Sequence, residues 1–394
     1  MHVKVPFRQV YTKRRVMMYI PKAIVDMSEV SKDLKLIFEF QSMNLEPILV
    51  VNDNLIEGEV IPTFTLTNDH LSKPHGYAYS SLNIFSGIIE TYRFVRFASK
   101  WKPDILIVYK SGGFFPLIPL ILKLVHKNKV NEGIKFALKL DSDGSIIASR
   151  WPTRFGFKIL MRVSQLFYDL IISETPCGME KFIQFLGHKN KLTTIPDGYD
   201  QDIFQKIGYS DSKREKIIIT ASRIDRPKNI ESLLRSFVPL ANVYPDWNLV
   251  IAGKVDDNDY FEELVSFTKA NNISERVSFL GHLNPVELRK QYLLASIFVT
   301  LSFKESFGIA RVEAIASGLP VITSPAGCGE FYGQNGAVLV SPDDNLEITR
   351  KLLELIRNEG NREEIVRNLQ KIIRSWKEVA KDIVDKTYPS LNCE

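Results

Sequence analysis

The chain lacks the features that mark secreted, metal-binding and membrane-spanning proteins. Its 394 residues include only three cysteines, Cys177, Cys328 and Cys393, which lie far apart and fit no metal-ligand spacing. That cysteine usage favours a reducing compartment. Residues 1–9 contain no apolar core of a secretory signal. The longest apolar stretch, residues 114–125, is interrupted by two prolines and a lysine, and it is too short to cross a bilayer.

A large excess of charge of one sign is also lacking. The 51 basic and 46 acidic residues leave a formal net charge of +5. This mild excess suits anionic small molecules or an anionic membrane surface, and it does not require nucleic acid as a partner. The hydrophobic content of 45% and the charged content of 25% are typical of a soluble globular protein. The length suits two domains better than one compact core.

The C-terminal half shows a regular alternation of expected strands and helices. Six apolar, β-rich runs are expected as strands: Ile217–Ala221, Leu249–Ala252, Val277–Leu280, Ile297–Leu301, Val321–Thr323 and Ala337–Val340. Four segments between them have helical periodicity: Ile230–Val243, Tyr260–Asn271, Pro285–Ala295 and Gly308–Ser317. Such alternation predicts a parallel sheet with right-handed crossovers. This half is therefore expected to form a Rossmann-like domain that binds ligands at the carboxyl ends of its strands.

The N-terminal half shows the same alternation less clearly. Its candidate strands are Val16–Ile20, Ile48–Val51, Thr63–Leu66, Ile105–Val108, Phe136–Leu140 and Leu170–Ser173. Its candidate helices are Val30–Met43, Leu82–Lys100 and Leu117–Lys127. A polar stretch without strong periodicity marks a linker at 205–215, between a domain at 1–204 and a second domain at 216–374. Residues 347–370 are expected to form a single helix.

The segment from Glu305 to Thr323 is the most informative part of the chain. A strand leads into a loop that carries Glu305, the loop opens a helix, and Glu313 follows on that helix. Gly318 then ends the helix and Pro320 begins the next strand. The N-terminus of a helix favours an anion, because its first N–H groups are unpaired and the macrodipole is positive there. A diphosphate is the expected anion, and the two glutamates can bind hydroxyl groups, so the segment indicates a nucleotide-sugar site.

This segment resembles the E-x7-E motif of glycosyltransferase family 4, whose members have the two-domain GT-B fold. Residues 221–229 are similar to the family's strand followed by "GR(L/I)xxxKN", and residues 195–200 stand where the family usually has "IPNGVD". Two further core strands look similar at 249–253 and 277–281. The resemblance implies an α/β protein in which two Rossmann-like domains face each other across a cleft. The start of the C-terminal segment, at Ser375, resembles a helix that crosses back, which places a crossover helix and tail at 375–394.

The resemblance implies a retaining transfer of a hexose-type sugar from a nucleotide diphosphate to an acceptor, without metal or cofactor. Arg223 and Lys228 would clamp the diphosphate and stabilise the leaving group as catalytic residues. Glu305 would reach the hydroxyls of the transferred sugar, and Glu313 would hold the ribose. The other donor-binding positions are expected in the loops: Phe307, Gly308, Ile309, Gly253, His282 and Leu283. Alternatively, the two cations lie on the surface and the two glutamates have no ligand.

Two family features are absent from the N-terminal half. Residues 19–24, after the first expected strand, contain no glycine, whereas the family commonly has a glycine-rich loop there. Gly112 and Gly113 either supply a loop for close approach to the acceptor or form a plain turn. No histidine stands at the strand end where many relatives have one. The expected mechanism therefore lets the diphosphate itself take the proton of the acceptor.

Asp141 and Asp143 form a D-x-D pattern, which other glycosyltransferases use to bind a divalent metal. Here the pair follows a strand of the acceptor-side domain, and no further carboxylate or histidine nearby in sequence completes a site. We therefore expect the two aspartates to contact the acceptor or to line the cleft, with no metal bound.

A basic stripe recurs every four residues, and aromatic side chains flank it; it consists of Arg150, Arg154, Lys158 and Arg162. On a helix the stripe would either rest on an anionic membrane or receive a lipid-phosphate acceptor. Alternatively, it is the solvated face of an ordinary amphipathic helix. The protein is accordingly expected in the cytoplasm, free or peripheral on the cytoplasmic face of a membrane. The acceptor is expected to be a glycan, a lipid-linked sugar or a small molecule.

Two other classes of function stay open beside the glycosyltransferase. A nucleotide-sugar epimerase of the GT-B fold would convert the donor without an acceptor. A non-catalytic binder of sugar nucleotides would use the same C-terminal pocket without turnover. Loops, and not the fold, decide among these classes and select the base, the sugar and the acceptor.

Overall fold

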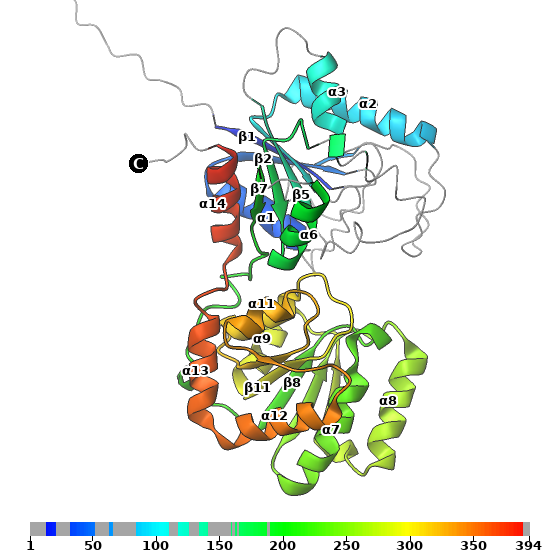
Figure 1. The fold of residues 1–394 in the computed structure, drawn as a ribbon, viewed down its shortest axis with the longest axis vertical. Coiled ribbons are helices and arrows are strands. Elements are labelled where there is room, and N and C mark those ends of the chain that lie inside the picture. Colours follow the sequence, from blue (N-terminus) through cyan, green and yellow to red (C-terminus); the bar gives the residue numbers. More distant parts are fainter. Residues whose placement is uncertain are drawn as a thin grey trace, which may run out of the picture. The chain divides into compact units, whose positions relative to one another are not determined.

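Two parallel sheets organise the part of the chain that the structure describes (Figure 1). The structure is a computed structural model, and it describes the following residues: 13–20, 32–51, 63–65, 84–109, 117–125, 134–140, 159, 162–163, 165–186 and 190–388. Within these ranges, one compact unit holds the residues up to Leu140, those from 159 to Ile171 and those from Val384 onward. The other unit holds Ile172–Ile383. The predicted α/β fold with two Rossmann-like sheets is confirmed.

The first sheet has seven strands in the order β3-β2-β1-β4-β5-β6-β7. Their bounds are β1 Arg15–Tyr19, β2 Glu46–Val51, β3 Thr63–Thr65, β4 Ile105–Tyr109, β5 Lys135–Leu140, β6 Leu170–Ser173 and β7 Leu192–Thr194. Its helices are α1 Lys32–Ser42, α2 Ile84–Trp101, α3 Ile118–Val125 and α6 Pro176–Leu186. Strand β1 pairs in parallel with β2 and β4, and its last four side chains are fully buried. Burial on both faces explains why these strands read as continuous apolar runs.

The second sheet has six strands in the order β10-β9-β8-β11-β12-β13. Their bounds are β8 Ile217–Ala221, β9 Asn248–Ala252, β10 Val277–Gly281, β11 Ile297–Thr300, β12 Val321–Thr323 and β13 Val338–Leu339. The helices of this part are α7 Ile230–Val243, α8 Asn258–Ala270, α9 Pro285–Leu294, α10 Ile309–Ala316, α11 Gly329–Gln334, α12 Asn345–Arg357 and α13 Glu359–Leu369. Helix α7 packs against α8 and α12 (Figure 1), whereas α9 packs against α10.

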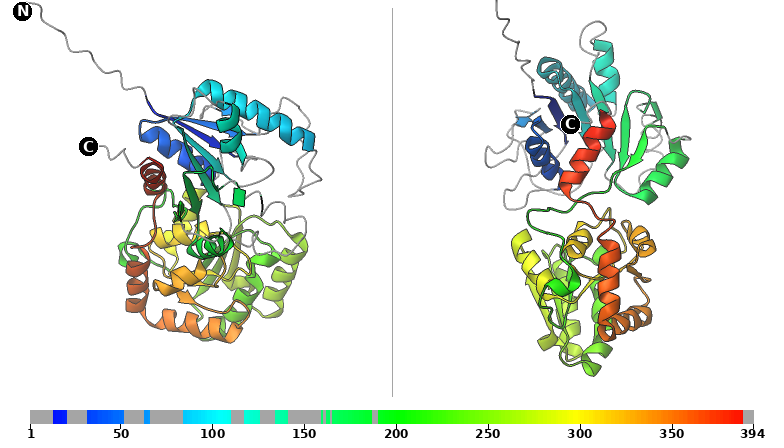
Figure 2. Two further views of the ribbon diagram at one scale, coloured as in Figure 1. Left: turned by 45° about the horizontal axis from the view of Figure 1, so that its top comes forward. Right: turned by 90° about the vertical axis from the view of Figure 1, so that its left-hand side faces the viewer.

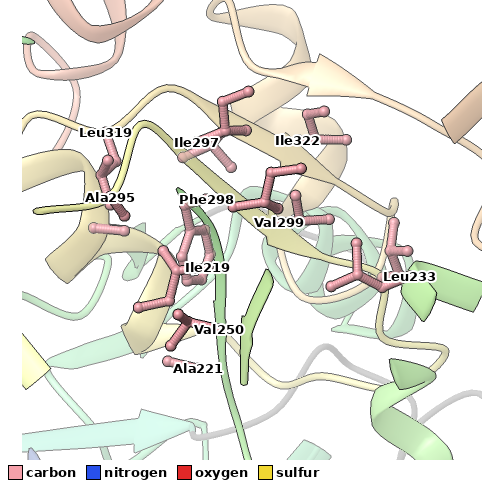
Figure 3. Packing of buried hydrophobic residues seen from close by; sticks show 14 of the residues in the cluster. Ile219, Ala221, Leu233, Val250, Ala295, Ile297, Phe298, Val299, Leu319 and Ile322 are labelled. Carbon is pink, nitrogen blue, oxygen red and sulfur yellow. The ribbon is translucent and has the colours of Figure 1, made fainter. Parts of the chain in front are cut away.

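The core of the second unit lies between this sheet and its helices. Figure 3 shows side chains of β8, β9, β11 and β12 meeting one another and Leu233 of α7. Phe298 on β11 stacks edge-on against Tyr292 of α9 with ring centroids 5.8 Å apart, and both side chains are fully buried. The central strands β8 and β11 are thus held from both faces, and their carboxyl ends form a fixed edge for the loops that follow.

The prediction of a single helix over residues 347–370 is wrong. The structure has two helices there, α12 and α13, which meet at an angle (Figures 1 and 2). Asn358 between them is extended, with φ −128° and ψ 97°, and its side chain accepts a hydrogen bond from the Asn361 N–H at 3.0 Å. An asparagine cap of this kind starts a new helix and so ends the previous one. Strand β7 and helices α6 and α11 were not predicted.

The predicted linker 205–215 lies within the second unit and packs against its other elements. Its Ile207 N–H donates to the Ala316 carbonyl at 3.1 Å, and its Glu215 N–H donates to the Leu294 carbonyl at 2.7 Å. The Arg214 guanidinium donates to six backbone carbonyls: Tyr209, Tyr292, Leu293, Ala295, Ser317 and Gly318. Burial lowers the pKa of Arg214 to about 10. These bonds make the segment a structural part of the unit that follows it.

Helix α14, Trp376–Thr387, is the last element of the described chain. Ser375 and Glu378 begin it with reciprocal hydrogen bonds: the Ser375 hydroxyl accepts from the Glu378 N–H at 3.2 Å, and the Glu378 carboxylate accepts from the Ser375 N–H at 2.7 Å. This capping box explains the predicted helix start near Ser375. The described chain rejoins the first unit at Val384. The crossover of this helix and the boundaries at 204 and 374 stay predictions.

Candidate active site

Three neighbouring strands of the second sheet bring the candidate site together. Strands β8, β11 and β12 are adjacent and parallel, so the loops after Ala221, Thr300 and Thr323 leave the sheet at the same edge. A cavity of about 160 Å³ lies at this edge. Its lining includes five residues that carry the argument: Arg223, Lys228, Glu305, Gly308 and Arg311. The carboxyl edge of such a sheet is where α/β proteins bind their ligands.

Lys228 and Glu305 form an ion pair inside this cavity. The Lys228 Nζ lies 2.5 Å from the Glu305 Oε2, and the two side chains are 11% and 22% exposed. Seventy-seven positions separate them in sequence, so only the sheet order brings them into contact. A nearly buried lysine paired with one carboxylate can hold an anion, while the carboxylate can accept hydrogen bonds from hydroxyl groups.

The loop that carries Lys228 is anchored to the loop that carries Glu305. Asn229, which begins α7, has a left-handed backbone with φ 53°. Its side-chain amide donates to the Leu301 carbonyl at 3.3 Å and to the Pro342 carbonyl at 2.6 Å. The Phe303 N–H also donates to the carbonyl of the residue before Lys228, at 2.8 Å. These bonds fix the distance between the two loops and hence the ion pair.

Arg223 lines the same cavity and already has two carboxylate partners. Its Nη2 lies 3.1 Å from Asp225 and its Nη1 lies 3.0 Å from Asp256. Gly253 belongs to this arrangement, because a Cβ there would lie 1.6 Å from the Ser222 carbonyl oxygen. The need for glycine at that position thus comes from close packing of two loops. The sequence prediction missed both aspartates, and a carboxylate placed four residues after each expected strand end was the available signal.

The N-terminus of α10 faces the cavity at Gly308 and Ile309. Gly308 is the cap residue with φ 86°, a left-handed conformation that favours glycine, and no side chain caps the helix. The first N–H groups of a helix have no partner within it, so they are directed to a ligand or to solvent. The Phe307 side chain is buried in the core. It holds the turn in place, so that only its backbone is available for contact with a ligand.

Glu313 lies one turn beyond Ile309 on the same face of α10, and it is half-buried. It does not line the cavity that holds Lys228 and Glu305. Its neighbour is Tyr292, whose pKa is raised by burial and, to a smaller extent, by the charge of Glu313. A ligand that spans from the cavity along the helix would reach Glu313 with a different group from the one that Lys228 binds.

His282 and Leu283 follow β10 at the outer edge of the sheet, two strands away from β8. His282 is exposed, and Leu283 packs against the hydrophobic core. Neither residue lines the cavity. The structure therefore places this pair at the same edge as the candidate site, but apart from the lysine–glutamate pair.

The remaining predicted positions lie outside the described residues, except Arg162. Those outside are Gly112, Gly113, Asp141, Asp143, Arg150, Arg154 and Lys158. Arg162 is helical and exposed. Among the described residues, no group of three or more acidic, histidine or cysteine side chains could hold a metal ion. In the same ranges, no helix has both the length and the apolar character to span a membrane.

Arg311 is a further residue of the site that the sequence prediction missed. It is 2% exposed and lies on the inner face of α10, beside Ala314 and Ile315. Its guanidinium donates to the Thr323 hydroxyl at 2.7 Å and to the carbonyls of Phe307 and Gly327. An arginine on the apolar face of a helix was the signal in the sequence, because a cation rarely points into a core without a purpose.

Comparisons with known proteins agree with this geometry. Residues 202–372 match the family described as "Glycosyl transferases group 1". Mannosylfructose-phosphate synthase of Agrobacterium fabrum is 26% identical over 60% of this chain, and the match spans 57% of that protein. Alpha-monoglucosyldiacylglycerol synthase of Acholeplasma laidlawii is 24% identical over 79% of this chain and 80% of its own length.

A solved structure shares the whole two-sheet fold. The Anabaena protein HepE, in complex with UDP and glucose, superposes with a TM-score of 0.70 over 96% of this chain and 100% of that chain, at 18% identity. The relatives' names and the family match support the prediction of a transferase. The sheets, the order of the loops and the match of residues 202–372 to the glycosyl transferases group 1 family agree with one another.

Proposed function

We propose that the chain transfers a hexose-type sugar from a nucleotide diphosphate to an acceptor, with retention of anomeric configuration. The observation that carries this proposal is the Lys228–Glu305 pair at the N-terminus of α10. It places a cation, a carboxylate and a helix N-terminus around one cavity. A diphosphate matches the cation and the helix N-terminus, and sugar hydroxyls match the carboxylate.

Each group then has one task in the proposed reaction. Lys228, Arg223 and the backbone at Phe307–Ile309 stabilise negative charge on the departing diphosphate. Glu305 orients the transferred sugar, and Glu313 holds the ribose. The bond between the anomeric carbon and the diphosphate breaks, the acceptor oxygen bonds to that carbon from the same face, and the diphosphate takes the acceptor's proton. No metal and no cofactor enters this scheme.

A donor-binding panel tests the proposal. Thermal unfolding would be followed with UDP-, GDP-, ADP- and dTDP-sugars, because a ligand at about a hundred times its Kd adds about 2.7 kcal/mol of stability. We expect a shift with one base, and a smaller shift in Glu313→Ala. Glu262→Ala, an exposed glutamate on α8, is the matched control and should respond like the wild type. The absence of any shift with all four donors would overturn the proposal.

The reaction class is tested by the products. NMR of the transferred sugar should show the anomeric configuration of the donor, and an inverted product would refute retention. Turnover of the donor to an epimer without acceptor would instead support the epimerase. Binding without turnover on any acceptor would support a non-catalytic role.

A lipid or lipid-linked acceptor is the class we favour. The support is the likeness to alpha-monoglucosyldiacylglycerol synthase over 79% of this chain, together with the basic stripe that ends at the exposed Arg162. The stripe variant with all four cations changed to glutamine should no longer sediment with vesicles that contain phosphatidylglycerol. Equal sedimentation of variant and wild type would refute a role of the stripe in membrane contact.

A further inference from the structure

Two of the three cations that line the cavity are balanced by carboxylates within the protein. Lys228 is paired with Glu305 at 2.5 Å, and Arg223 is paired with Asp225 and Asp256 at 3.1 and 3.0 Å. Within each pair the carboxylate charge offsets the charge of the cation, so these pairs contribute little net positive charge to the cavity. A diphosphate, which carries several negative charges, requires a source of positive charge that is not already balanced.

Arg311 supplies a charge of that kind. Its hydrogen-bond partners are a hydroxyl and two backbone carbonyls, all of them neutral. Its guanidinium also stacks over the Tyr332 ring at 4.5 Å. Within the described part of the chain, no carboxylate lies within ion-pair distance of Arg311, and its Nε has no hydrogen-bond partner. The side chain lines the cavity and is 2% exposed, so solvent screens its charge poorly.

The packing around Arg311 is adapted to the guanidinium. A Cβ at Gly308 would lie 2.9 Å from its Nη2. The guanidinium connects the turn before α10, through the Phe307 carbonyl at 2.6 Å, to the turn before α11, through the Gly327 carbonyl. Desolvating a charge costs several kcal/mol per ion, and an apolar side chain of similar volume would fill the space without that cost. The charge itself is therefore the property to explain.

We propose that Arg311 is a positioning residue that supplies this cavity with a positive charge not paired to a carboxylate and fixes the turn before α10 for the diphosphate of the donor. The inference rests on the proposed function, since it assigns a residue to the same site. It acts from beneath the backbone of Phe307 and Gly308 and does not require contact with the substrate. Arg311 thus differs from Lys228 and Arg223, which must exchange a carboxylate partner for a phosphate.

Calorimetric titration of matched ligands tests the proposal. UDP, GDP and ADP would be compared with uridine, guanosine and adenosine on the wild type, Arg311→Met, Arg311→Lys and Arg362→Met. Arg362 is the matched control: it is 7% exposed in α13, donates to two backbone carbonyls and does not line the cavity. Its loss should lower the melting temperature without changing either affinity.

We expect Arg311→Met to weaken binding of the nucleoside diphosphate that the wild type prefers by about 30-fold, which corresponds to about 2 kcal/mol. The affinity for the matching nucleoside should not change, and Arg311→Lys should stay within about fivefold of the wild type because the charge is kept. If Arg311→Met does not fold, Arg311→Gln carries the same expectation, because its amide can still donate to one of the acceptors.

Two results would overturn the inference while leaving the proposed function intact. One is an unchanged affinity of Arg311→Met for the diphosphate. The other is an equal loss for diphosphate and nucleoside, which would reveal a purely structural role. A wild type that binds none of UDP, GDP and ADP would overturn the proposed function itself, and this inference with it.

Discussion

Glu305→Gln separates the charge of the Glu305 side chain from its ability to accept hydrogen bonds. The Glu305 carboxylate holds Lys228 at 2.5 Å, and it also accepts a hydrogen bond from the Ser306 N–H at 3.1 Å. Glutamine has the same shape and can keep the bond to Ser306, but it carries no charge. The substitution therefore releases the lysine for phosphate and removes one negative charge from the cavity.

The size of the effect follows from the charges in the cavity. Two unit charges about 6 Å apart interact by about 2.8 kcal/mol at an effective dielectric constant of about 20, and partial exposure of the site reduces this by about half. We therefore expect Glu305→Gln to bind the preferred nucleoside diphosphate about tenfold more tightly. A sugar hydroxyl loses a charge-assisted hydrogen bond worth about 1.5–3 kcal/mol. The preference for the nucleotide sugar over the nucleoside diphosphate should therefore fall by about 30-fold.

The assay is calorimetric titration of the wild type and the variant. The affinity for UDP is compared with the affinity for UDP-glucose, and the corresponding GDP and ADP ligands are compared in the same way. Glu263→Gln is the matched control, because Glu263 pairs with Arg226 at 2.6 Å on the same unit but does not line the cavity. The control should change neither affinity. If Glu305→Gln lowered the affinity for both ligands of a pair equally, the glutamate would only support its loop. The assignment of Glu305 to the sugar would then be wrong.

Three further substitutions test how the site is supported. Gly318→Ala should lower the melting temperature by about 10 °C, because φ is +78° there and a Cβ would lie 2.8 Å from two carbonyl oxygens. Asp256→Asn should tighten diphosphate binding about threefold in a titration by freeing Arg223, whereas Asp246→Asn, far exposed, should not change it. Ser375→Ala should cost about 1 kcal/mol in a thermal unfolding experiment through loss of the cap of α14, and Ser375→Thr should restore most of it.

The strands were predictable where burial on both faces produces a continuous apolar run in the sequence. Strands β8, β9 and β11 are buried between helices, and each reads as an apolar run bounded by polar residues. Strand β7 has only three residues, two of them threonines, so no run marks it. The break between α12 and α13 was missed for a different reason. A local asparagine cap at Asn358 interrupts a helical periodicity that continues on both sides of it.

The members of the candidate site were predictable, but their pairing was not. Sequence patterns named Lys228 and Glu305 separately, each by its place after an expected strand. Their contact depends on the left-handed backbone of Asn229 and on its bonds to carbonyls of two distant loops. Asparagine is among the few residues that adopt this conformation readily, yet the sequence does not say which asparagine does so. Contacts set by backbone conformation in loops therefore have to come from the structure.

The charges at the site differ in how strongly solvent weakens them. Arg223 is 58% exposed, so salt screens its pairs with the two aspartates. Arg311 is 2% exposed, and its field reaches the cavity through protein with little screening. Exposed cations can exchange carboxylates for phosphate and release the product again, whereas a buried cation holds its position and its charge throughout. In the proposed reaction the cavity must both hold a diphosphate and let it leave afterwards, and a buried and an exposed cation suit these two tasks.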